Sequence, residues 1–198
     1  MRIATDHRDA ILQTAAKLFA RKQFHEVLMD DVADKAGIAK GTIYRYFSNK
    51  NDLFAALSIQ WLDLLGNEMG EIVASGAPPL DRMRQMLARL TQLVHDHDDF
   101  FQVMMRHECQ LLANRQCDFS EKRAVMRDHF VTVIKEAQAR SELQCPLDPK
   151  NAADMLMGML RSLLRFSTPR PTPAETASMV MHIFVKGLGT GGRNGASS

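Results

Sequence analysis

The stretch 29–54 constrains this chain most, because its pattern predicts two short helices separated by a tight turn. Met29, Val32 and Ala36 recur at the spacing that places side chains on one face of a helix. Gly37 follows where that helix would end, since glycine adopts a positive φ without a clash of a Cβ atom. A second helix is then expected to begin shortly after Gly37.

In the second predicted helix, Ile43 and Phe47 lie four residues apart and therefore share an inward face. The side chains left to point outward are cationic, hydroxylated or aromatic, with a glycine that permits close approach of another surface. They are Lys40, Gly41, Thr42, Tyr44, Arg45 and Tyr46. Two short helices joined by a glycine turn, the second with such a face, predict a helix-turn-helix that reads DNA.

The length of 198 residues is enough for a buried core in one or two domains. The composition is ordinary for a globular protein, and no apolar run is long enough to span a bilayer. The segment 1–12 contains two aspartates and no apolar region of the kind found in secretory signals. We therefore expect a cytoplasmic protein with no membrane partner.

Charge and cysteine content agree with this class of protein. Residues 1–50 contain nine Lys and Arg against six Asp and Glu, whereas residues 51–198 contain 16 against 17. A mild basic bias in the helix-turn-helix segment is what phosphate binding favours. The three cysteines, Cys109, Cys117 and Cys145, are far apart and form no C-x-x-C pair, so they predict buried thiols and not a disulfide framework or a zinc site.

Several residues predict where helices start and stop. Asp6 is the expected N-cap of a first helix that runs to about Arg21. Asn49, with Asp52 three residues later, predicts the start of a long helix. The sequence SGAPPL at 75–80 is a strong helix breaker and ends it.

Beyond residue 80 the apolar pattern stays helical, in segments near 80–94, 100–112 and 120–141, with a polar break at 95–99. No alternation of period two is long enough for a strand. The pattern therefore predicts an all-α protein.

The last two helices have clear starts. Asp148 before Pro149 is typical of an N-cap followed by a proline at the first helical position, and Thr172 with Glu175 forms a capping box. Both helices carry more apolar residues than one face can hold. This favours a homodimer that pairs them as a four-helix bundle, whereas the alternative is that they are simply central in their own domain.

A long ordered block between about residues 8 and 57 carries a family pattern. Its residues are Ile11, Leu12, Ala15, Ala16, Leu18, Phe19, Phe24, Asp31, Val32, Ala33, Ala36, Gly37, Ile38, Lys40, Gly41, Thr42, Ile43, Tyr44, Tyr46, Phe47, Lys50, Leu53 and Phe54. In this block the chain resembles the tetracycline-repressor (TetR) family of bacterial transcription regulators. The resemblance implies about nine helices, a homodimer through the last two, and an effector pocket among the middle ones. It also implies that the outward residues Lys40 to Tyr46 lie at the major groove and that Lys50 reaches a phosphate.

The chain departs from the family pattern at three places. Gln23 stands where the family usually has glycine, and Ala39 replaces a common serine before the recognition helix. Val27 and Leu28 stand where serine or threonine usually caps the second helix and contacts a phosphate. The missing hydroxyl predicts about 1 kcal/mol less capping, and backbone N–H groups would have to make any phosphate contact there.

The middle helices are rich in methionine and phenylalanine, which is usual for a core but also suits a tolerant apolar pocket. The residues hypothesised to line such a pocket are Trp61, Phe100, Met104, His107 and Phe130, with His107 as a polar handle. A small lipophilic effector bound there would shift the dimer toward a geometry whose recognition helices no longer fit the operator.

Other sites are poorly supported by the sequence. The run His95-Asp96-His97-Asp98-Asp99 could bind a transition metal, but an exposed polar helix end explains it better. His107 and Cys109 are two residues apart on a predicted helix, so they point to different sides and do not form a nucleophile pair. No motif indicates an enzyme or a cofactor.

The domains expected from these patterns are a DNA-binding domain at 1–50, a helical effector-binding and dimerisation domain at 51–188, and a disordered tail at 189–198. The expected function is a repressor that an effector releases from operator DNA. The alternative is a DNA-binding protein whose C-terminal core is filled and takes no effector.

Overall fold

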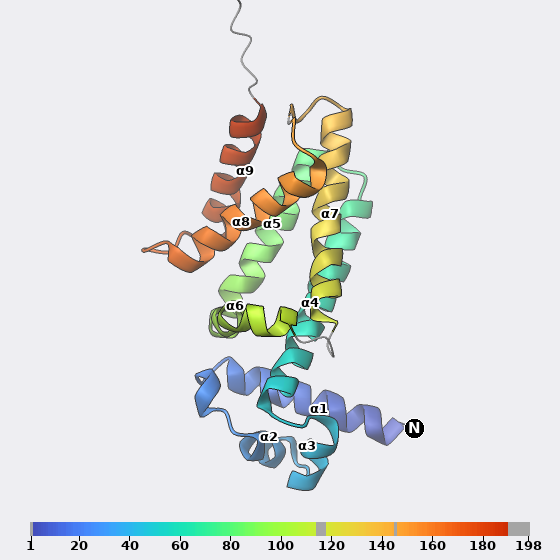
Figure 1. Cartoon of the computed structure of the whole chain (residues 1–198), viewed down its shortest axis with the longest axis vertical. Helices are drawn as coiled ribbons and strands as arrows, with labels where there is room; N and C mark the ends of the chain where they lie inside the picture. The colour runs from blue at the N-terminus through green and yellow to red at the C-terminus, as the bar shows by residue number, and fades with distance from the viewer. Residues whose placement is uncertain (1, 114–117, 145, 190–198) are drawn as a thin grey trace, which may run out of the picture. The chain divides into compact units, whose positions relative to one another are not determined.

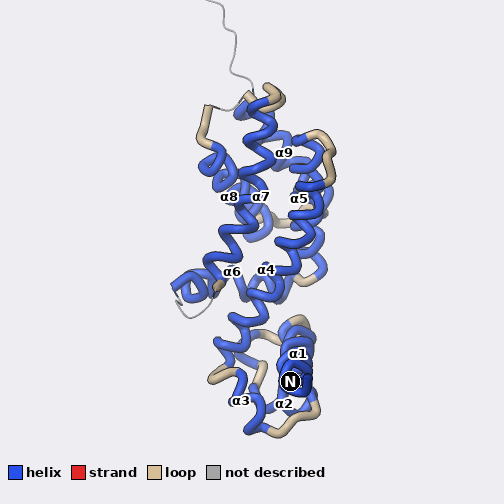
Figure 2. The backbone as a smooth tube through the Cα atoms, turned by 90° about the vertical axis from the view of Figure 1, so that its right-hand side faces the viewer, coloured by secondary structure: helices blue, strands red, loops and turns tan. Residues whose placement is uncertain are grey.

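Helices make up the regular structure of the described chain, as the tube in Figure 2 shows. The computed structural model describes residues 2–113, 118–144 and 146–189. Within these ranges there are nine α-helices, one short 3-10 helix and no strand, which confirms the predicted all-α fold (Figure 1). The helices are α1 (Arg2–Phe19), η1 (Phe24–Glu26), α2 (Met29–Ala36), α3 (Lys40–Tyr46), α4 (Lys50–Ala74), α5 (Pro79–Asp96), α6 (Asp98–Ala113), α7 (Phe119–Ala139), α8 (Pro149–Phe166) and α9 (Pro173–Gly189).

Contacts divide the chain into two compact units. The first unit joins Met1–Leu64 to Asp96–Arg123, and the second joins Leu65–His95 to Ala124–Ser198. The first unit thus holds α1 to α3, the first part of α4 and α6. The domain limits at residues 50 and 188 stay predictions.

The helix α1 supplies a large share of the apolar core of the first unit. Its buried side chains are Ile11, Leu12, Ala15, Leu18 and Phe19, the stripe that helical spacing would place on one face. The prediction of Asp6 as the N-cap is wrong, because α1 begins at Arg2. Residues 2–5 contain no proline or glycine, so nothing in them stops the helix from extending toward the N-terminus.

The turn between α2 and α3 is built as predicted. Met29, Val32 and Ala33 are the buried side chains of α2. Gly37 has φ 68° and ψ 31° in the left-handed region, which ends α2 at the cost of no Cβ clash. The backbone N–H of Ile38 then donates to the Ala33 carbonyl at 3.1 Å, which satisfies one of the last carbonyls of the helix.

The start of α4 confirms the predicted cap. The Asn49 side-chain oxygen accepts from the backbone N–H of Asp52 at 3.0 Å, and the Asn49 amide donates to the Asp52 carboxylate at 3.2 Å. After Ala74, Gly76 adopts φ 73°, so the chain turns inside the predicted breaker segment.

In the second unit, α8 and α9 begin at the predicted caps. The Asp148 carboxylate accepts from the backbone N–H of Lys150 at 2.9 Å, and the Glu175 carboxylate accepts from the backbone N–H of Thr172 at 2.8 Å. The latter hydrogen bond lowers the pKa of the Glu175 carboxyl below its ordinary value. Local signals therefore fix both helix starts.

An arginine ties α4, α5 and α7 together in the second unit. Arg82 is almost fully buried, and its guanidinium donates to the Val73 carbonyl at 2.7 Å and to the Glu136 carboxylate. The bond from Arg82 holds the pKa of Glu136 below its ordinary value. Since Val73 lies in the last turn of α4, Arg82 also satisfies a carbonyl that the helix itself leaves unpaired.

Some predictions concern residues whose side chains or backbone lie outside the described part. These are the thiols Cys109, Cys117 and Cys145 and the tail after Gly189. Among the described helices, none is long and apolar enough to cross a membrane. In the described ranges no three His, Cys, Asp or Glu side chains gather as a metal site would require.

Candidate nucleic-acid interface

The recognition helix α3 presents its polar side to solvent. Ile43 is fully buried and Phe47 is 4% exposed, so these two side chains anchor the helix to the first unit. The six predicted DNA-facing residues lie on the rest of the helix surface: Lys40, Gly41, Tyr44 and Arg45 are exposed, and Thr42 and Tyr46 are half-buried. Tyr44 is 51% exposed although it is a large aromatic residue, which suits a side chain that packs against a partner.

One of the six side chains already has an ionic partner. The Lys40 ammonium lies 2.8 Å from the Asp30 carboxylate, across the turn between α2 and α3. The hydrogen bond to Asp30 raises the pKa of Lys40 above its ordinary value, so the ammonium stays charged. Arg45, by contrast, is exposed and makes no ion pair among the residues that the structure describes.

Lys50, the predicted phosphate contact, points back into its own unit. Its ammonium donates to the carbonyls of Phe24 at 2.8 Å and His25 at 3.3 Å, and it lies 4.7 Å from the centre of the Phe24 ring. Burial lowers the pKa of Lys50 from its ordinary value. Lys50 therefore joins the first turn of α4 to η1, and its contact with a phosphate stays a prediction.

The three departures from the family pattern each have a local structure. The backbone N–H of Gln23 donates to the Glu26 carboxylate at 2.9 Å, so the chain makes one 3-10 turn there. Leu28 and Ala39 occupy the N-cap positions of α2 and α3, and neither side chain makes a capping hydrogen bond. Leu28 is 57% exposed, so an apolar side chain stands beside the first turn of α2.

Two of the predicted effector residues come together in the first unit. The rings of Trp61 and Phe100 have centroids 5.9 Å apart, and Phe101 and His97 also lie against Trp61. Phe100 is only 2% exposed, while Met104 is half-buried on the same helix. This cluster joins α4 to α6 by aromatic packing.

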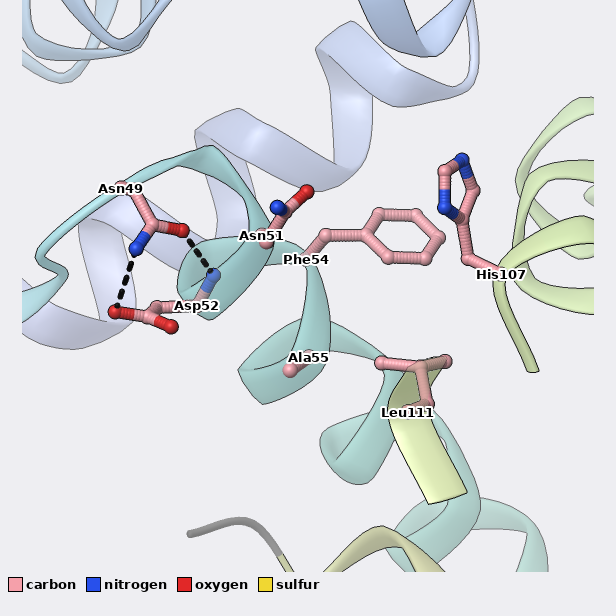
Figure 3. Close-up of a pocket in the computed structure, with 7 residues that line it drawn as sticks. All are labelled: Asn49, Asn51, Asp52, Phe54, Ala55, His107 and Leu111. Carbon is pink, nitrogen blue, oxygen red and sulfur yellow. Dashed lines mark hydrogen bonds between the residues drawn. The ribbon is translucent and has the colours of Figure 1, made fainter. Parts of the chain in front are cut away.

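His107 lies at the wall of a cavity in the first unit, as Figure 3 shows. The cavity has a volume of about 390 Å³, in the lower part of the range for small-molecule sites. Its walls come from the first turns of α4 and from α6, and the lining residues are Asn49, Asn51, Asp52, Phe54, Ala55, His107 and Leu111. The Phe54 ring points at His107, whereas the Asp52 side chain turns toward Asn49.

Phe54 is a structural residue that the sequence alone did not single out for the site. Its ring contacts Phe19, Phe24 and Phe100, with centroids 5.2, 5.3 and 5.3 Å away, and it lies 6.3 Å from His107. Phe54 thus joins α1, η1 and α6. In the sequence Phe54 stood only among the residues of the family pattern, because its partners come from distant parts of the chain.

The remaining predicted effector residue belongs to the second unit. Phe130 is fully buried on α7 and is not among the residues that line the cavity at His107. The predicted set is therefore divided between the two units, and its role in binding an effector stays a prediction.

The helices α8 and α9 contact each other and expose apolar side chains. Met155 and Phe166 on α8 are 51% and 72% exposed, and Met179 and Ile183 on α9 are 43% and 53% exposed. These helices also bury a second set of apolar residues within the unit, so apolar side chains occur on both their inner and outer faces.

Two family models match the chain. One, described as bacterial regulatory proteins of the tetR family, covers residues 11–57. The other, described as the C-terminal domain of tetracyclin repressor-like proteins, covers residues 76–188. Together they include the helix-turn-helix and most of the helices that follow.

Individual proteins agree with these models. The transcriptional repressor KstR2 of Mycobacterium tuberculosis is 32% identical over 144 residues, which are 71% of each chain. The structure of FadR from Bacillus subtilis in complex with stearoyl-CoA covers 90% of this chain and 98% of its own, at 20% identity and a TM-score of 0.74. The structure of KstR2 from Mycobacterium tuberculosis covers 91% and 94%, at 22% identity and a TM-score of 0.68.

Proposed function

This chain belongs to the tetracycline-repressor family of bacterial regulatory proteins, and we propose that it represses transcription by placing α3 in the major groove of operator DNA. Members of this family are DNA-binding regulators and not enzymes, and this chain is therefore a DNA-binding regulator too. The proposed contacts are Lys40, Gly41, Thr42, Tyr44, Arg45 and Tyr46 on α3, and Lys50 at the start of α4. The observation that carries the proposal is the polar, mostly exposed side of a short helix whose apolar side is buried.

The seven residues divide by chemistry. Arg45 and Lys40 can donate to guanine O6 and N7, and Thr42 can bond a base or pack on a thymine methyl group. The tyrosine hydroxyls and Lys50 suit phosphate oxygens, which fix the register without reading sequence. The location that fits this function is the cytoplasm, because the operator DNA lies there.

Substitution of Arg45 tests the recognition role. We expect Arg45→Ala to reduce binding to a duplex selected by the wild-type protein by about 1–3 kcal/mol and to change binding to a shuffled duplex far less. Lys35→Ala, which removes an exposed cation from α2, is the control for net charge. Equal losses on the selected and shuffled duplexes would show that Arg45 does not read sequence.

We further propose that a small hydrophobic effector releases the protein from DNA. The aromatic cluster around Trp61 and Phe100 supports an apolar site in the first unit. The cavity at His107 adds a wall of mixed character, because Phe54, Ala55 and Leu111 line it together with polar residues of the first turn of α4. Met104 lies on the same helix as His107. The structural relative FadR holds stearoyl-CoA, so a long-chain acyl compound is the effector class to examine first.

Thermal-shift screening of lipophilic compounds, followed by DNA release, tests the effector. A compound that raises the melting temperature and dissociates the selected duplex supports the proposal. If lipophilic compounds leave the melting temperature unchanged, or stabilise the protein without releasing DNA, the alternative of a filled core without an effector holds.

The proposed assembly is a homodimer through α8 and α9. The four exposed apolar side chains on these helices support it, because such residues are enriched where subunits pair. Ile183→Asp should shift sedimentation toward the monomer, whereas Val125→Asp, which changes an equally exposed apolar residue on α7, should not. A dimer of this kind would read a near-palindrome with half-sites ~34 Å, or a small multiple of that distance, apart.

A further inference from the structure

An apolar side chain stands at the entry to α2 and is left in solvent. Leu28 occupies the N-cap position of α2, makes no capping hydrogen bond with its side chain, and is 57% exposed. Its two neighbours in the chain, Val27 and Met29, are buried. The neighbours therefore anchor this segment to the core, and Leu28 remains as an apolar surface with no packing role within the protein.

The ion pair between Asp30 and Lys40 places Leu28 beside the start of the recognition helix. Asp30 follows Leu28 by two residues, in the first turn of α2, and its carboxylate lies 2.8 Å from the Lys40 ammonium. Lys40 is the first residue of α3. The first turns of α2 and α3 are therefore neighbours, and Leu28 lies at the end of α2 that is next to the start of α3.

This position defines which part of DNA Leu28 would meet. In a helix-turn-helix, the first residues of the recognition helix contact base edges in the major groove, while the preceding helix crosses the backbone at the edge of that groove. Leu28 has no side-chain donor for a phosphate, so it gains from DNA only by burying apolar surface. Among the base edges of the major groove, thymine presents an apolar group, its C5-methyl.

We propose that Leu28 is a specificity-determining residue, which packs on the C5-methyl group of a thymine in each half-site of the operator. The inference rests on the proposed DNA-reading role of α3. Where a purine stands at that position, Leu28 meets a polar N7 atom, and where a cytosine stands there, it meets no methyl group. The apolar contact therefore adds to operator binding and not to random binding, so it raises discrimination between them.

The family pattern usually has serine or threonine at this entry, and a hydroxyl would act differently there. It would cap α2 and donate to a phosphate, a group that every DNA sequence offers. Leu28 thus replaces a contact that positions the protein on any DNA by one that depends on a base.

Removal of the methyl group from DNA tests the contact directly. Deoxyuridine pairs as thymine does and lacks the C5-methyl group. When each thymine of one half-site is replaced in turn, we expect one position at which the affinity of the wild-type protein falls about two- to fourfold, as for the loss of one buried methyl group. Leu28→Ala changes both subunits of the proposed dimer, so it should weaken binding to the thymine duplex by roughly four- to sixteenfold. Deoxyuridine at the same position should then cost this variant nothing more.

The experiment uses the full chain, a duplex enriched from a random pool by the wild-type protein, and a shuffled duplex of the same composition. Affinities are measured by fluorescence anisotropy from about 50 to about 300 mM salt. Leu64→Ala is the matched control, because Leu64 is a leucine of the same unit, on α4, and is 46% exposed. Leu28→Ser supplies a capping hydroxyl, so it separates loss of the methyl contact from weakening of the start of α2.

One pattern of results is expected. The thymine methyl at one position of the half-site should matter to the wild-type protein and to Leu64→Ala, but not to Leu28→Ala or Leu28→Ser. Methyl groups that another residue contacts, such as Thr42, should keep their effect in all variants. The slope of log K against log salt should be the same for Leu28→Ala and the wild-type protein, since a neutral side chain displaces no counterion.

Other results overturn the inference. If the wild-type protein is insensitive to every thymine methyl, or if each sensitive position stays sensitive in Leu28→Ala, Leu28 does not read a thymine. Equal losses of Leu28→Ala on the enriched and shuffled duplexes would mean that Leu28 packs on sugars, which are the same at every base pair. If the wild-type protein enriches no sequence from the pool, the proposed function fails and this inference with it, whereas an enriched sequence without the expected position overturns the inference alone.

Discussion

Lys50→Met is the substitution that best distinguishes two roles of Lys50. One role is to hold α4 to η1 by hydrogen bonds within the protein, and the other is to contact a DNA phosphate. Methionine keeps an apolar stem against Phe24 but removes the ammonium, which donates to the carbonyls of Phe24 and His25. A hydrogen bond from a charged donor contributes about 1.5–3 kcal/mol, and the lower end applies because Lys50 is partly exposed. The cation over the Phe24 ring adds about 0.5 kcal/mol. The expected loss of unfolding free energy is therefore about 2 kcal/mol.

Calorimetry measures what Lys50 contributes to the stability of the fold, and DNA titration measures its contact with phosphate. For a chain of this length, a loss of about 2 kcal/mol lowers the melting temperature by roughly 4–8 °C. Lys35→Met is the control, since Lys35 is exposed and has no hydrogen bond or ion pair within the described residues. If Lys50→Met melts at the same temperature as the control, the hydrogen bonds of Lys50 to η1 do not stabilise the fold. A salt slope that falls by about 0.9 on all DNA would then assign Lys50 to a phosphate.

Three further substitutions test local features of the fold, namely the turn after α2, the cap of α9 and the packing of Phe54. Gly37→Ala meets open space but must hold φ near 68°, so it should cost about 1 kcal/mol and lower the melting temperature by roughly 2–4 °C in calorimetry. The lowered pKa of Glu175 means that its cap on Thr172 stabilises the fold above the ordinary carboxyl pKa and is lost as the pH falls through the lowered value. Glu175→Gln should therefore show a smaller loss of melting temperature between pH 7 and acid pH than wild type. Phe54→Leu should weaken operator binding more than Phe130→Leu, both measured by band shift at equal fractions folded, because Phe54 alone of the two packs against η1.

Capping signals in the sequence predicted helix starts because the partners of a cap are close in the chain. Asn49 and Asp52 bond across three residues, and so do Thr172 and Glu175. No tertiary packing is needed to form such bonds, so the residue types are sufficient evidence. The predicted start of α1 at Asp6 was wrong because a suitable capping residue does not by itself begin a helix. No residue before Asp6 prevents the helix from continuing toward the N-terminus.

Side-chain partners across the fold were beyond the reach of the sequence. Lys50 bonds to Phe24, 26 residues away, and Lys40 bonds to Asp30 on the other side of the turn. Helical periodicity states which residues share a face but not which residue of another helix meets that face. For the same reason His107 was recognised as a polar group for a pocket, whereas its neighbours at the cavity wall were not.

The charge of the DNA-reading unit also needs to be judged by its pairs. A count of charges in residues 1–50 assumes that every cation is available to a DNA phosphate. In the structure, however, Lys22 and Lys40 form ion pairs with carboxylates of α2, and the Lys50 ammonium donates to backbone carbonyls. An ammonium that must leave a partner gains less from DNA than one that leaves only water. Arg45 is exposed on α3 and has no such partner within the described chain, so its contact carries no cost of release. Discrimination by this helix should therefore depend first on Arg45, because Lys40 must give up its ion pair with Asp30 to contact an operator.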